Sequence, residues 1–246
     1  FVAEVLDEAG RLGIKAALII SAGFREVGRE GAEMERQLAA IAKGYGMRVI
    51  GPNCLGVINT HHRMNATFTN NFPRAGPIAI SSQSGAICSV LLDWAAGTNV
   101  GFSKFVSVGN KMDVEESFML DYLRHDERTK VIGMYIEGVN KGKEFMEQAA
   151  LTTKVKPIIA LKAGRTSTGA KAASSHTGAL SGSDRIYDTV LRQSGIIRVT
   201  TIEEMFDLIT IFANMPMPRD NRVAIVTNAG GLGVMAADAL GDQNLT

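Results

Sequence analysis

The segment Ile78-Ala79-Ile80-Ser81-Ser82-Gln83-Ser84-Gly85-Ala86 joins a short apolar run to a turn of small polar residues. A helical pattern follows over 86–96, so the segment predicts a buried strand that turns directly into a helix. Further apolar runs begin at residues 102, 131 and 157, at intervals of 24, 29 and 26 residues, which is the spacing of βαβ units. Strands that are apolar throughout belong to parallel sheets with helices on both faces. The sequence therefore predicts an α/β protein with doubly wound parallel sheets.

Similar runs extend this arrangement over the rest of the chain. The expected strands are 16–20, 48–50, 78–81, 102–108, 131–136, 157–161, 196–199 and 223–226, and the expected helices include 86–96, 115–123, 143–153 and 184–193. An Asn-rich stretch at 65–74 and a Pro-containing stretch at 213–220 divide the chain. We expect half of an α/β domain over 1–72, a complete one over 73–216 and the start of a third over 217–246. One large doubly wound sheet is the alternative.

Composition and charge exclude several classes of protein. The 26 basic and 25 acidic residues nearly cancel, and no basic patch is present, which argues against nucleic-acid binding. No apolar run approaches the ~18 residues of a membrane span, so we expect no membrane partner. Cys54 and Cys88 cannot form a disulfide framework, which favours a reducing compartment such as the cytoplasm. The chain opens directly into an amphipathic pattern at Phe1, so we expect a fragment or a chain numbered from its first ordered residue.

The turn formed by Ser82, Gln83, Ser84 and Gly85 is a candidate anion site. A helix that starts after a parallel strand places free backbone N–H groups at the carboxyl edge of the sheet, and serine hydroxyls add donors. A capped helix with nothing bound is the simpler alternative. A serine-hydrolase elbow around Ser84 fits poorly, because Ser82 stands where that motif has glycine.

His176 stands in a stretch of small residues, 171–184, between an expected strand and an expected helix. Small neighbours leave an imidazole accessible, so His176 is a candidate functional residue, with a capping role as the alternative. The other histidines share polar or charged surroundings that are typical of surface residues: His61, His62 and His125.

Glu137 follows the expected strand 131–136 at the edge where open α/β sheets bind ligands. A carboxylate there can hold one imidazole nitrogen protonated and leave the other free as a nucleophile. A solvated glutamate at a strand end is the alternative.

The stretch 231–236 fits the dinucleotide pattern G-x-G-x-x-A only weakly, since the expected acidic partner would lie past residue 246. No cluster of His, Cys and carboxylates has metal-ligand spacing, so we predict no protein-ligated metal.

Taken in order, several segments resemble the nucleoside-diphosphate-forming acyl-CoA synthetases, and most closely the α subunit, or α-like half, of the ADP-forming acetate–CoA ligases, relatives of succinyl-CoA synthetase. The segments are 51–56 (Gly-Pro-Asn-Cys-Leu-Gly), 81–85 (Ser-Ser-Gln-Ser-Gly), 108–113 (Val-Gly-Asn-Lys-Met-Asp), 135–138 (Tyr-Ile-Glu-Gly) and 174–179 (Ser-Ser-His-Thr-Gly-Ala). The resemblance implies a partial CoA-binding Rossmann domain followed by a flavodoxin-like domain that carries a phosphorylated histidine.

The resemblance also implies an activity, an acid–thiol ligase that interconverts acyl-CoA, ADP and phosphate with carboxylate, ATP and CoA. His176 would be the nucleophile that takes the phosphoryl group from an acyl phosphate, and Glu137 would orient it. The helix start at 82–85 would bind phosphate. The implied CoA- and acyl-binding residues are Asn53, Cys54, Gly109 and Asn110.

The implied ligands and partners follow from the same resemblance. They are coenzyme A as substrate, a small carboxylic acid, phosphate, and an ATP-grasp β subunit or fused ATP-grasp domain that holds ADP or ATP with Mg; an oligomer is expected. Two alternatives remain, an acyl-CoA-binding regulatory or protein-acetyltransferase relative without ligase turnover, and a nucleotide- or CoA-sensing module. No residue decides which carboxylic acid is used.

Overall fold

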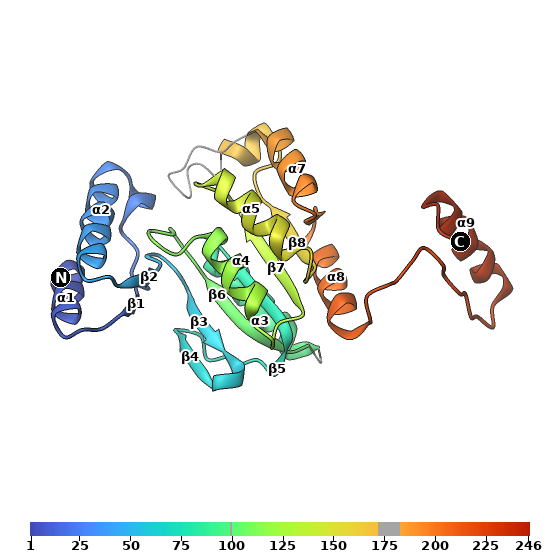
Figure 1. Cartoon of the computed structure of the whole chain (residues 1–246), viewed down its shortest axis with the longest axis horizontal. Helices are drawn as coiled ribbons and strands as arrows, with labels where there is room; N and C mark the ends of the chain where they lie inside the picture. The colour runs from blue at the N-terminus through green and yellow to red at the C-terminus, as the bar shows by residue number, and fades with distance from the viewer. Residues whose placement is uncertain (99, 172–182) are drawn as a thin grey trace. The chain divides into compact units, whose positions relative to one another are not determined.

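The structure is a computed structural model that describes residues 1–98, 100–171 and 183–246. The chain divides into two compact units, Phe1–Ala213 and Asn214–Thr246. Figure 1 labels their helices and strands. The first unit contains two separate sheets, a parallel pair near the N-terminus and a seven-stranded sheet that follows it.

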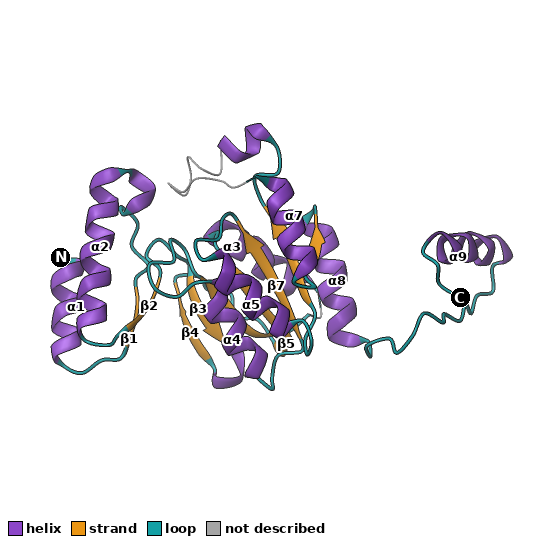
Figure 2. Ribbon diagram, turned by 45° about the horizontal axis from the view of Figure 1, so that its top comes forward, coloured by secondary structure: helices purple, strands orange, loops and turns teal. Residues whose placement is uncertain are grey.

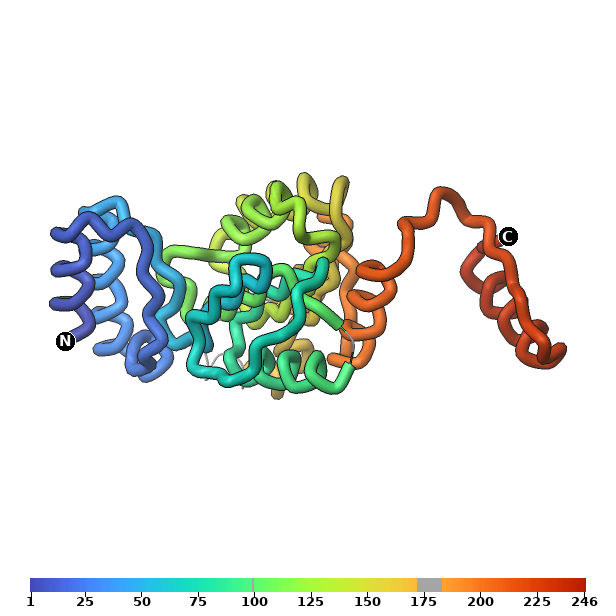
Figure 3. Tube along the Cα trace, turned by 90° about the horizontal axis from the view of Figure 1, so that it is seen from below, coloured from blue at the N-terminus to red at the C-terminus, as the bar shows by residue number. Residues whose placement is uncertain are grey.

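The N-terminal part of the first unit packs two helices against the parallel pair. Its elements are α1 (Val2–Arg11), β1 (Ala16–Leu18), the 3-10 helix η1 (Arg25–Val27), α2 (Arg29–Gly44) and β2 (Arg48–Ile50). The two α-helices lie side by side (Figure 3). Leu6 of α1 and Leu38 of α2 share an apolar core with Val49 of β2. The amphipathic pattern that begins at Phe1 therefore forms a helix.

The seven-stranded sheet has the strand order β4-β3-β6-β5-β7-β8-β9. The strands are β3 (Gly56–Asn59), β4 (Met64–Thr67), β5 (Ala75–Ser82), β6 (Phe102–Ser107), β7 (Val131–Ile136), β8 (Ile158–Lys162) and β9 (Ile197–Val199). The last five are parallel to one another. Numbered along the chain their order is 2-1-3-4-5, which is the flavodoxin-like arrangement. The predicted fold class, with parallel-sheet domains in tandem, is confirmed.

Helices cover both faces of this sheet, as the apolar strands require. They are α3 (Gly85–Gly97) and α8 (Ile202–Asn214) on one face, and α4 (Glu116–His125), α5 (Gly142–Thr152) and α7 (Asp184–Gln193) on the other. Figure 2 shows α4 and α5 in front of the sheet. On the opposite face the rings of Trp94 and Phe206 stack with centroids 3.8 Å apart and join α3 to α8.

The hairpin of β3 and β4, with the short 3-10 helix η2 (Thr60–His62) between its strands, forms an antiparallel edge of the larger sheet. Val57 and Ile58 of β3 pair with Val106 and Phe105 of β6. The hairpin lies within the stretch 1–72 that the sequence assigned to the first domain, yet it hydrogen-bonds to the sheet of the next.

The second unit contains one helix, α9 (Gly230–Asp242), in the part of the chain that the structure describes. The strand predicted over 223–226 is absent, so that prediction was wrong. An apolar run becomes a strand only beside another strand that takes its backbone hydrogen bonds. Here the backbone N–H of Val223 donates instead to the carbonyl of Thr246, at 2.7 Å.

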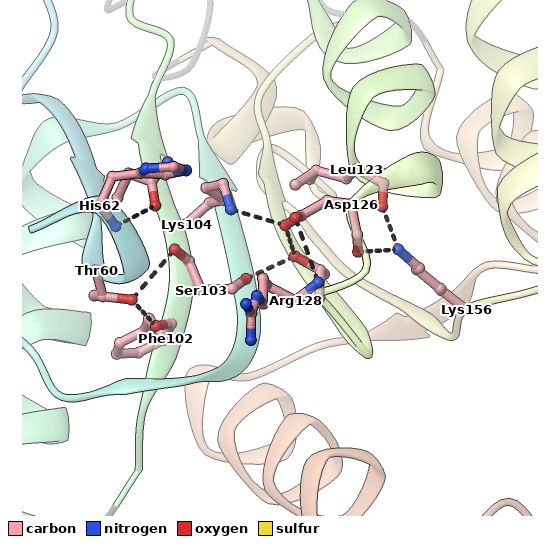
Figure 4. Close-up of polar contacts among 11 residues, drawn as sticks. Thr60, His62, Phe102, Ser103, Lys104, Leu123, Asp126, Arg128 and Lys156 are labelled. Carbon is pink, nitrogen blue, oxygen red and sulfur yellow. Dashed lines mark hydrogen bonds and ion pairs between the residues drawn. The ribbon is translucent and has the colours of Figure 1, made fainter. Parts of the chain in front are cut away.

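A buried polar cluster stabilises the amino-terminal edge of the larger sheet (Figure 4). Lys104 of β6 forms an ion pair with Asp126, with 2.9 Å between Nζ and Oδ2, and the Thr129 hydroxyl donates to the same carboxylate at 2.6 Å. Lys156 donates to the carbonyls of Leu123 and Asp126, both at 2.6 Å. Burial alone would raise the pKa of Asp126, but the hydrogen bonds from Thr129 and Lys104 outweigh it and hold the pKa below its ordinary value.

Among the described residues, none of the helices combines the length and the apolar character needed to cross a membrane.

Candidate active site

The strand order reverses between β5 and β7, and their carboxyl ends define the crevice in which flavodoxin-like sheets bind ligands. The β5–α3 turn and the β7–α5 loop meet there. Helix α3 begins at Gly85, and the Ser84 hydroxyl caps it by accepting from the backbone N–H of Ile87 at 3.3 Å. The first N–H groups of a helix have no partner within the helix, so this start offers backbone donors to an anion.

Ser82 is fully buried and holds this turn together. Its hydroxyl donates to the carbonyl oxygen of Ser84 at 2.9 Å and accepts from the Ser84 backbone N–H at 3.1 Å. The Ser82 hydroxyl, which the sequence offered as a phosphate donor, is therefore bonded within the turn. The Ser84 hydroxyl only accepts a hydrogen bond in its capping role, so that bond does not use its O–H. The helix start therefore presents the Ser84 O–H together with the backbone N–H groups around Gly85.

Gln83 links the two loops. Its Oε1 accepts from the backbone N–H groups of Glu137 and Gly138, at 2.9 and 3.0 Å. Its Nε2 donates to the Gly138 carbonyl at 2.7 Å and to the Glu116 carboxylate. Glu116 also pairs with Lys111, at 2.9 Å. Sequence reasoning did not single out Glu116 or give Lys111 a role of its own, because only the folded chain brings their loops to this edge.

Glu137 lies directly after β7 and is buried. Burial, together with the neighbouring Glu137 carboxylate, raises the pKa of Tyr135 to about 12. Lys162 ends the adjacent strand β8 and is also buried, with Nζ 4.3 Å from the ring centroid of Tyr187. Burial lowers the pKa of Lys162, although the carboxylates of Asp184 and Glu137 oppose that shift. Sequence reasoning missed Lys162, although a lysine that ends an apolar strand at the ligand-binding edge is a usable signal.

His176 lies outside the described residues, which stop at Lys171 and resume at Ser183. Lys171 and Ser183, the described residues on either side of this gap, belong to the connection between β8 and α7. His61, His62 and His125 are exposed, as the sequence predicted.

The turns that carry Asn53 and Asn110 are in direct contact. The Asn53 side-chain amide donates to Oδ1 of Asn110 at 3.3 Å, and the Asn110 backbone N–H donates to the Pro52 carbonyl at 2.9 Å. The Asn110 amide also donates to Glu26 at 2.6 Å and to Glu35 at 2.9 Å. Those two glutamates were not found from the sequence, because they come from η1 and α2, more than 70 residues earlier.

A cleft of about 460 Å³ lies between the Asn53 turn and the start of α3. Its walls include Asn53, Cys54, Phe68, Ser84, Gly85 and Ser89. Burial raises the pKa of Cys54 to about 11, and its Sγ donates to the carbonyl of Ile19 at 3.4 Å. Cys54 is therefore a neutral thiol near neutral pH. It forms part of the wall of the cleft and does not act as a nucleophile, because only a thiolate does so.

Two protein-family models match this chain. One, described as "Succinyl-CoA ligase like flavodoxin domain", covers residues 75–212, and one described as "CoA binding domain" covers residues 1–60. The chain belongs to the nucleoside-diphosphate-forming acyl-CoA synthetase family.

Individual members of that family match along nearly the whole chain. A Methanocaldococcus jannaschii protein named acetate–CoA ligase [ADP-forming] is 52% identical over 244 residues, which is 99% of this chain and 34% of that protein. The Pyrococcus furiosus acetate–CoA ligase [ADP-forming] I subunit alpha is 47% identical over 245 residues, which is 100% of this chain and 53% of the subunit.

A solved family structure has the same fold. It is the Ca. Korarchaeum cryptofilum dinucleotide forming acetyl-coenzyme A synthetase 1 in complex with phosphate and ADP, which has a TM-score of 0.94 and 41% identity. The match covers 99% of this chain and 53% of that one. The chain thus spans about a third to a half of the family members that it matches.

Within the described parts of the chain, no group of three or more His, Cys, Asp or Glu residues could hold a metal ion.

Proposed function

We propose that this chain is the CoA-binding and phosphoryl-carrying part of an ADP-forming acyl-CoA synthetase, which interconverts acyl-CoA, ADP and phosphate with carboxylate, ATP and CoA. One observation carries the proposal: the helix start proposed to bind phosphate and the Asn53–Cys54 turn proposed to bind the thioester line the same cleft. The names of its relatives support the same activity.

The first step joins phosphate to the acyl group. A phosphate oxygen attacks the thioester carbon, the C–S bond breaks and CoA leaves with the electron pair as its thiolate, which takes up a proton. Backbone N–H groups at the start of α3 stabilise the phosphate charge. Asn53 lines the thioester side of the cleft, and Asn110 supports it by accepting a hydrogen bond from its side chain, with Gly109 bringing the two turns together.

The second step moves the phosphoryl group onto His176. An imidazole nitrogen attacks phosphorus, the bond from phosphorus to the acyl oxygen breaks, and the carboxylate leaves. The Glu137 carboxylate accepts a hydrogen bond from the N–H of the other ring nitrogen. This bond fixes the tautomer of the imidazole and stabilises the positive charge that develops on it. ADP then takes the phosphoryl group on an ATP-grasp partner, which would supply Mg and the nucleotide site. The name "subunit alpha" of the Pyrococcus furiosus relative supports a separate or fused second component and an oligomeric assembly.

We also propose a cytoplasmic location, because Cys54 and Cys88 are free thiols of the kind that a reducing compartment maintains. A regulatory or protein-acetyltransferase relative, or a CoA-sensing module, would bind the same ligands without forming a phosphohistidine.

The test is phosphorylation of the full-length protein with its partner component, magnesium and ATP labelled at the γ-phosphate. We expect an acid-labile, base-stable label that His176→Ala removes and that His125→Ala, a change at an exposed histidine, leaves in place. A label that survives His176→Ala, or that sits on serine, refutes the mechanism. An unlabelled wild-type protein favours the binding alternatives.

A further inference from the structure

The loop after β7 is held by side chains from three other elements. Gln83, from the β5–α3 turn, binds the N–H groups of Glu137 and Gly138 and the carbonyl of Gly138. Lys111, from the β6–α4 loop, donates to the same carbonyl. Tyr187 of α7 accepts from the backbone N–H of Val139 at 3.0 Å. Three consecutive residues of a connecting loop are thus anchored, and Glu137 is the first of them.

The Lys111–Glu116 ion pair, which contacts this loop through Lys111, is buried, and burial is unusual for two charged side chains. The side chains of Lys111 and Glu116 are 4% and 2% exposed. Removing two charges from water costs several kcal/mol per ion, and packed apolar residues often stabilise a fold as well as a buried pair does. General stability is therefore a weak reason for this pair, so its geometry is the feature to explain.

The pair determines which way the Gln83 amide faces. A carboxylate only accepts hydrogen bonds, so the Glu116 oxygen must face the Nε2 end of Gln83. The Oε1 end is then directed to the two N–H groups that follow β7. With two bonds accepted and two donated, the amide has no capacity left for another ligand.

We infer that Gln83, oriented by the buried Lys111–Glu116 pair, is a positioning residue that holds the Glu137 carboxylate in place for phosphoryl transfer. The inference rests on the proposed function and goes beyond it. It gives Gln83 a role different from the phosphate contact that the sequence suggested. The phosphate charge is left to the start of α3.

The experiment separates the two half-reactions of the full-length protein with its partner component. Release of CoA from acetyl-CoA and phosphate reports acyl-phosphate formation, and labelled acetyl phosphate reports transfer to His176. We expect Gln83→Met to slow transfer about 10- to 100-fold, the size of effect seen when a hydrogen-bond partner that orients a metal ligand is removed. Acyl-phosphate formation and the KM for phosphate should change less than about twofold, because the α3 backbone is unchanged.

A matched control and a rescue sharpen the test. Gln148→Met makes the same change at a side chain that bonds Arg124 between α4 and α5, and it should leave both half-reactions unaltered. Gln83→Glu places two carboxylates together and should slow transfer. Adding Glu116→Gln restores an amide–carboxylate pair and the local charge, so the double variant should recover part of the transfer rate. If Gln83→Met does not fold, the comparison of Gln83→Glu with this double variant tests the inference instead.

Hydrogen–deuterium exchange gives a readout that does not need His176. Gln83→Met should speed exchange of the amides of Glu137 and Gly138, whereas Gln148→Met should not. Unchanged exchange there, or transfer within twofold of wild type, overturns the inference. A large rise in the KM for phosphate with equal losses in both half-reactions shows instead that Gln83 binds phosphate. A wild-type protein that forms no phosphohistidine contradicts the proposed function, while the exchange result still decides the role of Gln83.

Discussion

Gly109 lies so close to Pro52 that a Cβ built on it would be 2.3 Å from the Pro52 carbonyl oxygen. Its φ of +55° also falls in the left-handed region, which side chains rarely adopt. The contact brings the β6–α4 turn against the turn that carries Asn53. Only glycine satisfies both the conformation and the close approach.

Gly109→Ala should therefore lower the free energy of unfolding, by about 1–3 kcal/mol, the range for a strained backbone position. CoA binding by the full-length protein should weaken as the Asn53 and Asn110 turns move apart. Denaturant unfolding and CoA titration measure the two effects. The matched control is Gly142→Ala in α5, where a Cβ meets no atom within 4 Å, and it should be neutral or slightly stabilising. Equal effects of the two substitutions would show that the close approach does not matter.

Glu137→Gln should slow phosphoryl transfer to His176 by about 10²–10⁴, the usual contribution of a carboxylate that supports a reacting imidazole. CoA affinity should hold, because the CoA-side turns do not involve Glu137. Rapid-quench measurement of phosphohistidine formation tests this, with Glu147→Gln on the exposed surface of α5 as the control. Turnover of Glu137→Gln within a few-fold of wild type would show that Glu137 is a strand-end residue with no part in phosphoryl transfer.

Ser89→Leu should narrow the cleft at the wall formed by α3. The added volume should reduce kcat/KM for longer acyl-CoA substrates more than for acetyl-CoA, and each methylene that no longer fits costs about 10-fold or more. Steady-state kinetics over a series of acyl-CoA chain lengths measures the ratio. Val90→Leu, at the neighbouring exposed residue outside the cleft, should leave the ratio unchanged. A ratio that is the same in both variants places the acyl group elsewhere.

Asp126→Asn should destabilise the first unit by about 3 kcal/mol, since it leaves Lys104 buried without its counter-charge. The folded-state pKa of Asp126 is lowered, so its contribution is complete above the ordinary carboxyl pKa and is lost as pH falls through the folded-state value. The difference in unfolding free energy between wild type and variant should accordingly be constant near neutrality and shrink in acid. Asp121→Asn, at an exposed carboxylate that pairs with the half-buried Arg124, should cost under about 1 kcal/mol. A difference in unfolding free energy between wild type and Asp126→Asn that persists at low pH would contradict the role given to the Asp126 carboxylate.

The sequence by itself determined the repeating pattern of the larger sheet. Apolar runs predicted β5, β6, β7, β8 and β9 to within a few residues, because strands buried on both faces must be apolar along their length. The turn of small polar residues likewise predicted a helix from residue 86, and α3 begins at Gly85. The ordered segments from 51 to 179 were enough to predict the family, and the choice of His176 and Glu137 also came from the sequence.

Only the tertiary structure decided which groups meet. The β3–β4 hairpin joins the sheet through Val57 and Val106, 49 residues apart, and the apolar run at 223–226 forms no strand because no neighbouring strand pairs with it. The four hydrogen bonds of Gln83 and the burial of Lys111 with Glu116 follow from a strand order that brings three loops to one edge. Hydrogen-bond partners depend on distances between elements that are remote along the chain, so local sequence patterns carry no record of them.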